Sequence, residues 1–265
     1  MKKFDRAVAV YRTEGLGGLT RRLKNRAYRV VVALQRGLRR PVVSSAYGIR
    51  LAANWQDTTF RFYVYGSYGN YLSDLIAGIG RDFHFMDIGA NQGLYSILAA
   101  RNPNCRGCVA FEPVPGTAAL LRKNLALNAV SGSVEVIEAA VSGQVGRTVI
   151  HLNESHSGGA SLRSSEGSTS LRAIEIELVD AVGLLRWRRI PGLPIVVKID
   201  VEGHEPVVVK ELLKSSLAED ISMIFYECDE AWLDAGSFET MLRDAGFRKF
   251  EKIGSGTHYD VLAQR

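Results

Sequence analysis

The sequence is poor in cysteine and contains no long apolar run. Its three cysteines, Cys105, Cys108 and Cys228, are too few for a disulfide framework and are typical of a reducing compartment. The Cys105–Cys108 pair cannot complete a zinc site, because such a site needs two further ligands. No stretch of about 18 apolar residues is present, so we expect no transmembrane helix. These features favour a cytoplasmic protein.

Acidic residues are scarce at the N-terminus. The first 40 residues hold 12 of the 33 Lys/Arg and 2 of the 28 Asp/Glu. The other 225 residues therefore carry 21 Lys/Arg and 26 Asp/Glu. The net charge of +5 therefore comes from a basic N-terminal extension, residues 1–45, and the remainder is mildly acidic. Proteins that bind nucleic acid usually have a basic surface around the site. We therefore expect no nucleic-acid partner.

Residues 20–40 have the pattern of one amphipathic helix. The apolar residues that share one face are Leu23, Ala27, Val30, Val31, Leu34 and Leu38. The basic residues around the other face are Arg21, Arg22, Lys24, Arg29, Arg36, Arg39 and Arg40. Two hypotheses stay open. The helix docks on its own domain with its arginines solvated, or it contacts anionic lipid peripherally at the inner membrane face.

Strand and helix patterns alternate along most of the chain. Residues 46–65 read as two strands around a turn at 54–57, and a short helix completes a segment 46–80. Strands are then expected at 83–88, 107–112, 133–138, 194–200 and 221–227, and helices near 93–101, 117–128, 179–187, 204–214 and 237–246. This predicts an α/β domain, residues 81–265, with a doubly wound, mostly parallel sheet. FRKFEKI and HYDVLAQR form a closing hairpin, so the last strand should be antiparallel.

An insertion at about 146–178 interrupts this alternation. RTVIHLN and RAIEIEL alternate like strands, and HSGGASLRSSEGSTS between them is small and polar. We expect a flexible loop there, at the edge of the sheet where ligands bind.

A glycine-rich turn follows the first strand of the sheet. Ligands of open α/β sheets bind at the carboxyl ends of the strands, where this turn lies. Gly89 lets backbone approach a ligand closely, and Gly93 lets the next helix begin against the strand. Asp87 stands where the dinucleotide fingerprint has its first glycine. Because a carboxylate repels a pyrophosphate and attracts a sulfonium, the turn favours S-adenosylmethionine over a nicotinamide cofactor.

Two further strand ends suit an adenosine ligand. Glu112 ends the second strand, in FEPVP, where an acid can accept hydrogen bonds from both ribose hydroxyls. Ala139 and Ala140 follow the third strand and would offer small apolar surface to the adenine ring, unless they serve only packing.

The fourth strand ends in ionisable residues. These are Lys198, Asp200, Glu202, His204 and Glu205, within VKIDVEGHE. Such groups are costly near a core unless they are paired or used. His204 is a candidate general base for a hydroxyl, and Asp200 or Glu202 could act instead or orient it. The alternatives are a structural role for His204, a helix cap at Glu205, and a metal bound with Glu227. No spacing requires a metal, so we expect none.

Three motifs are distinctive in combination: DIGANQGLYS, FEPVP followed by a helix end with Asn124 and Asn128, and VKIDVEGHE. Together they closely resemble the FkbM family of class I S-adenosylmethionine-dependent methyltransferases. The similarity runs from about residue 66 to the C-terminus and includes SGGASL in the insertion. It implies a Rossmann-like sheet of seven strands, the last antiparallel, and methyl transfer to a hydroxyl oxygen.

The same resemblance implies roles for individual residues. The residues that would bind the cofactor are Asp87, Gly89, Asn91, Gly93 and Glu112. Asp200 and the region of His204 would face the acceptor. One departure occurs at Tyr68-Gly69-Asn70-Tyr71, where relatives commonly have a glutamate. Tyr68 and Tyr71 could shape an acceptor site or pack the segment that covers it.

Characterised relatives are similar in methylating sugars or polyketide-like natural products. The leading hypothesis is O-methylation of a saccharide or lipid-linked glycan, and the alternatives are a polyketide-like small molecule or a non-catalytic cofactor-binding scaffold. Methylation of a nucleobase amine is disfavoured, because the run from Lys198 to Val201 does not match D/N-P-P-Y/F.

Overall fold

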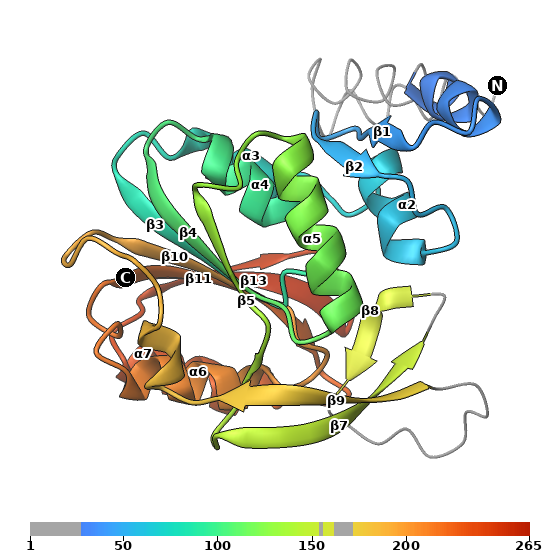
Figure 1. Cartoon of the computed structure of the whole chain (residues 1–265). Coiled ribbons are helices and arrows are strands. Elements are labelled where there is room, and N and C mark those ends of the chain that lie inside the picture. The colour runs from blue at the N-terminus through green and yellow to red at the C-terminus, as the bar shows by residue number, and fades with distance from the viewer. Residues whose placement is uncertain (1–27, 154–155, 162–171) are drawn as a thin grey trace, which may run out of the picture.

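The centre of the molecule is one seven-stranded sheet, seen in a computed structural model that describes residues 28–153, 156–161 and 172–265 (Figure 1). Its strands, in spatial order, are β12 (Lys249–Ile253), β13 (His258–Gln264), β11 (Ile221–Asp229), β10 (Ile195–Ile199), β3 (Phe83–Ile88), β4 (Cys105–Phe111) and β5 (Val134–Ile137). β11, β10, β3, β4 and β5 pair in parallel. β13 is antiparallel to both its neighbours, so the last strand alone runs against the other six. The predicted α/β sheet is confirmed.

Helices cover both faces of the sheet. α3 (Tyr71–Gly78), α4 (Leu94–Arg101) and α5 (Pro115–Leu127) lie above it in Figure 1, and α6 (Glu205–Lys214) and α7 (Ala235–Asp244) lie below. Every residue of β3 is buried as a result. Alternate side chains enter opposite cores: Phe85 packs in the core under α4, and Met86 packs in the core over α6.

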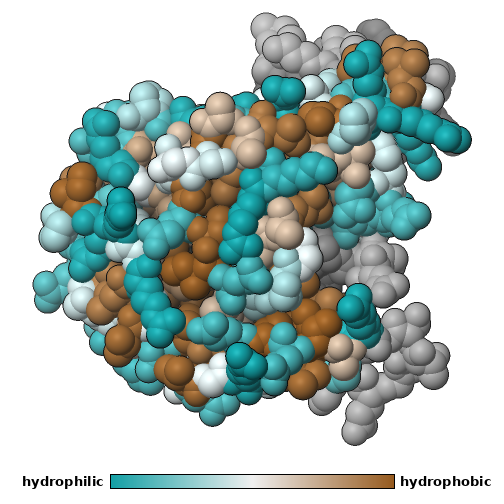
Figure 2. Space-filling model, in the orientation of Figure 1, coloured by the Kyte–Doolittle hydropathy of each residue, from teal (hydrophilic) through white to brown (hydrophobic). Residues whose placement is uncertain are grey.

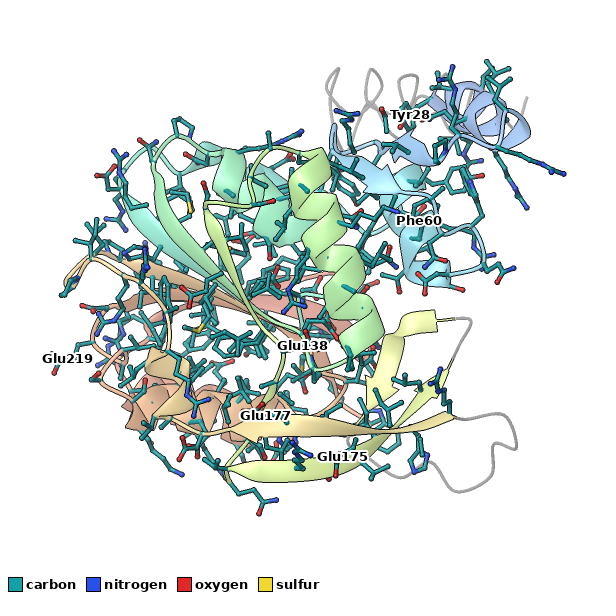
Figure 3. All side chains as sticks on the ribbon, in the orientation of Figure 1. Tyr28, Phe60, Glu138, Glu175, Glu177 and Glu219 are labelled. Carbon is teal, nitrogen blue, oxygen red and sulfur yellow. The ribbon has the colours of Figure 1, made fainter. Side chains whose placement is uncertain are left out.

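The segment before the sheet differs from the prediction. Its hairpin lies earlier, as β1 (Val42–Ser44) and β2 (Arg50–Ala52), and the expected second strand is a helix, α2 (Thr58–Tyr65). Asp57 starts this helix, because its Oδ1 accepts a hydrogen bond from the Phe60 amide at 2.7 Å. Phe60, labelled in Figure 3, is fully buried. The expected helix at 179–187 was also wrong: β9 runs to Val179, and only a 3-10 turn follows, Gly183–Leu185.

The insertion forms a sheet of its own. Its order is β6 (Ala140–Val141), β9 (Arg172–Val179), β7 (Gly146–Asn153) and β8 (His156–Ser161). β7 and β9 match the two predicted strands. β8 occupies part of the predicted loop, where its backbone pairs antiparallel with β7, and residues 162–171 lie outside the described part of the chain.

The asparagines at the end of α5 attach the β1–β2 hairpin to the body. Asn124 Oδ1 accepts from the Ala52 amide at 2.8 Å, and its Nδ2 donates to the Gln92 carbonyl at 2.9 Å. Asn128 Oδ1 accepts from the Arg50 amide at 2.9 Å. The hairpin and α2 share the core of α4 and α5, so they form one body with the sheet.

The predicted N-terminal helix is described from residue 28 and runs to 37; residues 20–27 lie outside the described part. Val32 is its fully buried side chain, whereas Val30, Leu34 and Leu38 are exposed. The face that the docking hypothesis placed against the domain is therefore exposed, and the helix packs through Val32 on another side. Within the described ranges, no helix has the length and hydrophobicity required to cross a bilayer.

Candidate active site

A pocket lies at the carboxyl ends of β3, β4 and β10. Of the nine predicted site residues, seven line it: Gly89, Asn91, Glu112, Ala140, Asp200, Glu202 and His204. The remaining two, Asp87 and Gly93, lie beneath the turn and are absent from its wall. The strand ends thus bring together residues spread over more than 100 positions of sequence.

The glycine turn requires glycine where it meets β10. Gly89 has a φ of 78°, and a Cβ placed there would lie 1.9 Å from the carbonyl oxygen of Asp200. Gly93, at φ 90°, begins α4, and its Cβ would lie 2.2 Å from Leu121 Cδ1. The two glycines therefore allow the turn to pack against its neighbours, and Gly89 also lines the pocket.

Asn91 adopts the left-handed conformation without being glycine, at φ 48°. Its Oδ1 accepts from the Gln92 amide at 2.8 Å, and its own amide donates to Glu112 Oε2 at 2.9 Å. Strained backbone of this kind is retained at sites where geometry matters. The turn is thereby fixed to the next strand end.

Asp87 does not face the pocket, contrary to the expectation that its carboxylate meets the sulfonium. It is 1% exposed, its Oδ2 accepts from Ser96 Oγ at 2.6 Å, and its Oδ1 lies 3.4 Å from Lys198 Nζ. Lys198 Nζ donates to the Gly89 carbonyl at 2.6 Å and lies 3.5 Å from Asp200 Oδ2. Burial lowers the pKa of Lys198, but the two carboxylates outweigh this and raise it, so the side chain is an ammonium. Asp87 thus acts on the turn through Lys198.

Glu112 is a buried carboxylate at the end of β4. Its Oε2 accepts from the Asn91 amide, and its Oε1 accepts from the Val114 amide at 3.0 Å. Burial raises the pKa of Glu112 to about 7, although both amides lower it. Carboxylate oxygens in this position on the pocket wall can accept hydrogen bonds from the hydroxyl groups of a bound ribose.

The insertion supplies apolar wall that sequence reasoning missed. Ala140 of β6 lines the pocket as predicted, and Ile150 of β7 and Ile176 of β9 join it. Both isoleucines are nearly fully buried. The signal was present in the alternation of RTVIHLN and RAIEIEL, because the apolar side of each strand needs a buried surface to pack against. The insertion is thus part of the site.

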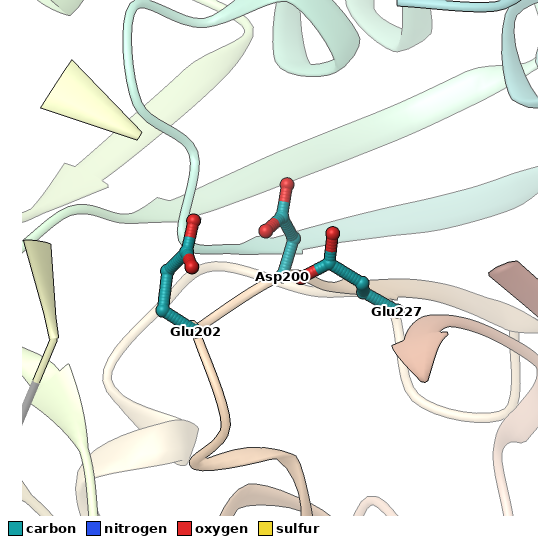
Figure 4. A group of neighbouring side chains, drawn as sticks. All are labelled: Asp200, Glu202 and Glu227. Atoms are coloured by element: carbon teal, nitrogen blue, oxygen red, sulfur yellow. The ribbon is translucent and has the colours of Figure 1, made fainter. Parts of the chain in front are cut away.

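Three carboxylates converge at the end of β10. One oxygen each of Asp200, Glu202 and Glu227 lies within 4.8 Å of the others, and the side chains point toward one another (Figure 4). Burial, and then repulsion by Asp200, raise the pKa of Glu202 to about 8 and that of Glu227 to about 7. Three oxygen donors could hold a hard cation. Protonation at neutral pH is the other means of relieving their repulsion.

The turn after Asp200 is built around Glu205. Its Oε1 accepts from the Val201 amide at 3.1 Å and from the Gly203 amide at 3.3 Å, which is the structural role considered for it. Glu202 takes a left-handed φ of 54° in this turn, and His204 is the N-cap residue of α6. The turn aims Glu202 and His204 into the pocket.

A second cavity, of about 390 Å³, adjoins the first. Its ionisable lining is Lys198, Asp200, Glu227, His258, Asp260 and the tyrosines Tyr68, Tyr95 and Tyr259. Tyr68 and Asp200 line both cavities, and the Tyr68 hydroxyl donates to Asp200 Oδ2 at 2.8 Å. Tyr71 instead stacks on Phe225 and bonds Glu251. Of the two tyrosines considered for an acceptor site, Tyr68 lines both cavities and Tyr71 lines neither.

His258 and Asp260 were not identified from the sequence. They lie on β13, where antiparallel pairing sets Asp260 opposite Glu227. His258 Nε2 lies 2.8 Å from Glu227 Oε1, and Glu227 with the nearby acids raises the pKa of His258 against the lowering effect of burial. No motif marks these residues, because strand pairing alone brings them to the site.

The chain is similar in sequence to known methyltransferases. The chain matches the methyltransferase FkbM domain over residues 87–249. It is 25% identical over 201 residues to methyltransferase sdnD of Sordaria araneosa, covering 65% of this chain and 76% of that protein. It is 25% identical over 218 residues to the hexuronic acid methyltransferase AglP of Haloferax volcanii, covering 81% and 85%. Among solved structures, the METTL16 methyltransferase domain aligns with a TM-score of 0.49 and 16% identity, covering 91% of this chain and 96% of that one.

Proposed function

Because the chain belongs to the FkbM methyltransferase family, whose cofactor is S-adenosylmethionine, we propose that it transfers the methyl group to a hydroxyl of a saccharide or lipid-linked glycan. The observation that carries the proposal is the position of Asp200, which lines both the pocket at the glycine turn and the adjoining polar cavity. A donor and an acceptor bound in these two cavities would meet at this residue. The named activity of AglP toward a hexuronic acid supports a saccharide acceptor.

The first pocket suits the cofactor. Glu112 offers carboxylate oxygens to the ribose hydroxyls, and Ala140, Ile150 and Ile176 form an apolar wall for the adenine ring. Gly89 lines this pocket, and its lack of a Cβ allows the turn to lie against the carbonyl of Asp200. When bound there, the cofactor supplies an electrophilic methyl group on a sulfonium. Asp87 and Gly93 hold the turn in place and do not touch the ligand.

In the proposed reaction, Asp200 takes the proton of the acceptor hydroxyl. A bound S-adenosylmethionine would supply the methyl group and would leave as the neutral thioether, and the Asp200 carboxylate would take the proton that the hydroxyl loses. The Tyr68 hydroxyl and the Lys198 ammonium both contact Oδ2, which orients this carboxylate. One oxygen of Glu202 lies within 4.8 Å of one of Asp200, and because the pKa of Glu202 is raised to about 8, its protonation relieves the repulsion between the two acids. Since His204 lines only the first pocket, we assign it to orienting the cofactor.

The second cavity favours a neutral acceptor over a uronic acid. Asp200, Glu227 and Asp260 line it, and burial raises the pKa of Asp260 to about 6. Its cationic groups are already engaged, Lys198 by two aspartates and His258 by Glu227. Carboxylates accept hydrogen bonds from sugar hydroxyls, whereas an acceptor carboxylate would be repelled. This contrasts with the acid substrate in the name of AglP.

Transfer of labelled methyl to a panel of neutral glycans, uronic-acid glycans and polyketide-like hydroxyls tests the function. We expect labelling of neutral glycans. With the active acceptor, Asp200→Asn should lower kcat about 100-fold or more and leave the affinity for S-adenosylhomocysteine unchanged, whereas His204→Ala should weaken that affinity. Glu239→Gln, an exposed change on α7, serves as control.

Two results would contradict the proposal. An unchanged kcat in Asp200→Asn would remove the base assignment. Cofactor binding without methylation of any member of the panel would favour the non-catalytic scaffold.

A further inference from the structure

The N-terminal helix, residues 28–37, exposes an apolar strip. Val30, Val31 and Leu34 of the helix are 62%, 45% and 62% exposed, and Leu38, in the turn that directly follows, is 65% exposed. At helical spacing, these four side chains lie on one side. Single exposed apolar side chains are common on protein surfaces, whereas a group of four adjacent ones needs an explanation. Figure 2 shows hydrophobic surface together with hydrophilic surface at the end of the molecule where Figure 1 has this helix.

The helix is fixed in this orientation by its other side. Val32 is fully buried, the Tyr28 hydroxyl donates to the Ser44 carbonyl, and Gln35 Oε1 accepts from the Ser44 amide at 2.8 Å. Tyr28 is labelled at this junction in Figure 3. The Arg36 guanidinium lies 5.7 Å from the centre of the Trp55 ring. The helix therefore packs through a mixed side and turns its most apolar side away from the body.

The surroundings of the strip carry charge of one sign. Residues 28–56 contain five arginines and no aspartate, glutamate or lysine. The arginines are Arg29, Arg36, Arg39, Arg40 and Arg50, and all are exposed. The first acidic residue after the helix is Asp57, which is 4% exposed and caps α2. A partner that binds this surface must therefore have both an apolar region and negatively charged groups.

We infer that the helix binds the surface of a bilayer that contains anionic lipid. Valine and leucine side chains would enter the acyl boundary, and the arginines would contact the phosphates beside them. Asn124 and Asn128 tie the hairpin below the helix to α5, so this contact would hold the whole methyltransferase body at the membrane. The inference is independent of the proposed acceptor, since it rests on a different part of the molecule.

Sedimentation with lipid vesicles tests the inference on the full chain. We expect binding to phosphatidylcholine vesicles that contain phosphatidylglycerol, little binding to phosphatidylcholine alone, and weaker binding at high salt. Leu34→Glu with Leu38→Glu should lower the partition coefficient at least about tenfold. The matched control is Val182→Glu, at a side chain that is 70% exposed on another surface, and it should bind like the wild type. Circular dichroism confirms that all variants are folded.

Three outcomes would overturn the inference. The wild type binds neither kind of vesicle, or the Leu34 and Leu38 variant binds as well as the wild type. In the third, the wild type is a dimer in solution that the same variant converts to a monomer, and the strip is then an interface between copies of this chain.

Discussion

The ionisation of Glu112 should control cofactor affinity near neutral pH. The carboxyl group is buried at the end of β4, and burial raises its pKa to about 7 despite two backbone hydrogen bonds. Only the ionised form can accept both ribose hydroxyls without a competing proton. Because the pKa of Glu112 in the free protein is about 7, the ionised form that binds the ribose is fully populated well above pH 7 and is lost as the pH falls through 7.

The size of the effect follows from the fraction ionised. With a pKa of about 7, roughly nine tenths of the molecules are ionised at pH 8 and about 3% at pH 5.5. The dissociation constant for S-adenosylhomocysteine should therefore rise about 30-fold between these pH values, equivalent to about 2 kcal/mol. Calorimetric titration at half-unit steps of pH measures this slope directly.

Glu112→Gln separates this group from the other acids of the site. The amide has nearly the same size but cannot ionise, so the variant should bind weakly and with an affinity that hardly depends on pH in this range. Glu202 and Glu227 also have raised pKa values and remain in the variant. A wild-type affinity that is constant from pH 5.5 to 8 would refute the reasoning. So would a variant whose affinity falls as steeply as that of the wild type.

Three further predictions follow from the packing and charge of the site. Asn124→Ala should lower the free energy of unfolding by about 2–4 kcal/mol in urea titrations, because the Ala52 amide and the Gln92 carbonyl lose their partner; a loss below about 0.5 kcal/mol would show that the hairpin does not depend on it. Gly89→Ala should abolish S-adenosylhomocysteine binding, because the new Cβ would meet the Asp200 carbonyl at 1.9 Å, whereas Gly80→Ala, with no atom within 4 Å, should bind normally. Dialysis against EDTA should leave methyl transfer unchanged, because protonation already relieves the repulsion among the three converging acids; activity lost on chelation and restored by Mg²⁺ would establish a cation at that cluster.

Local chemistry overrode the hydrophobic pattern in the segment before the sheet. Residues 58–65 alternate like a strand, but Asp57 caps a helix there and Gly66 ends it in the left-handed conformation. A single capping carboxylate decided between two states of similar propensity. The pattern at 179–187 failed for a different reason, since β9 pairs with β7 as far as Leu178 and with β6 at Val179.

The sequence by itself determined the strands of the seven-stranded sheet, the antiparallel end of the sheet, the glycine turn and the position of Glu112, Asp200 and His204 at strand ends. Each of these follows from periodicity or from a motif whose residues are close in the chain. Only the tertiary structure decided that Asp87 turns inward to Lys198, that Glu227, His258 and Asp260 share a cavity with Asp200, and that the N-terminal helix exposes its apolar strip. These contacts join residues far apart in sequence. The orientation of a buried charged side chain, or of a helix on the body, depends on partners that come close only when the chain folds.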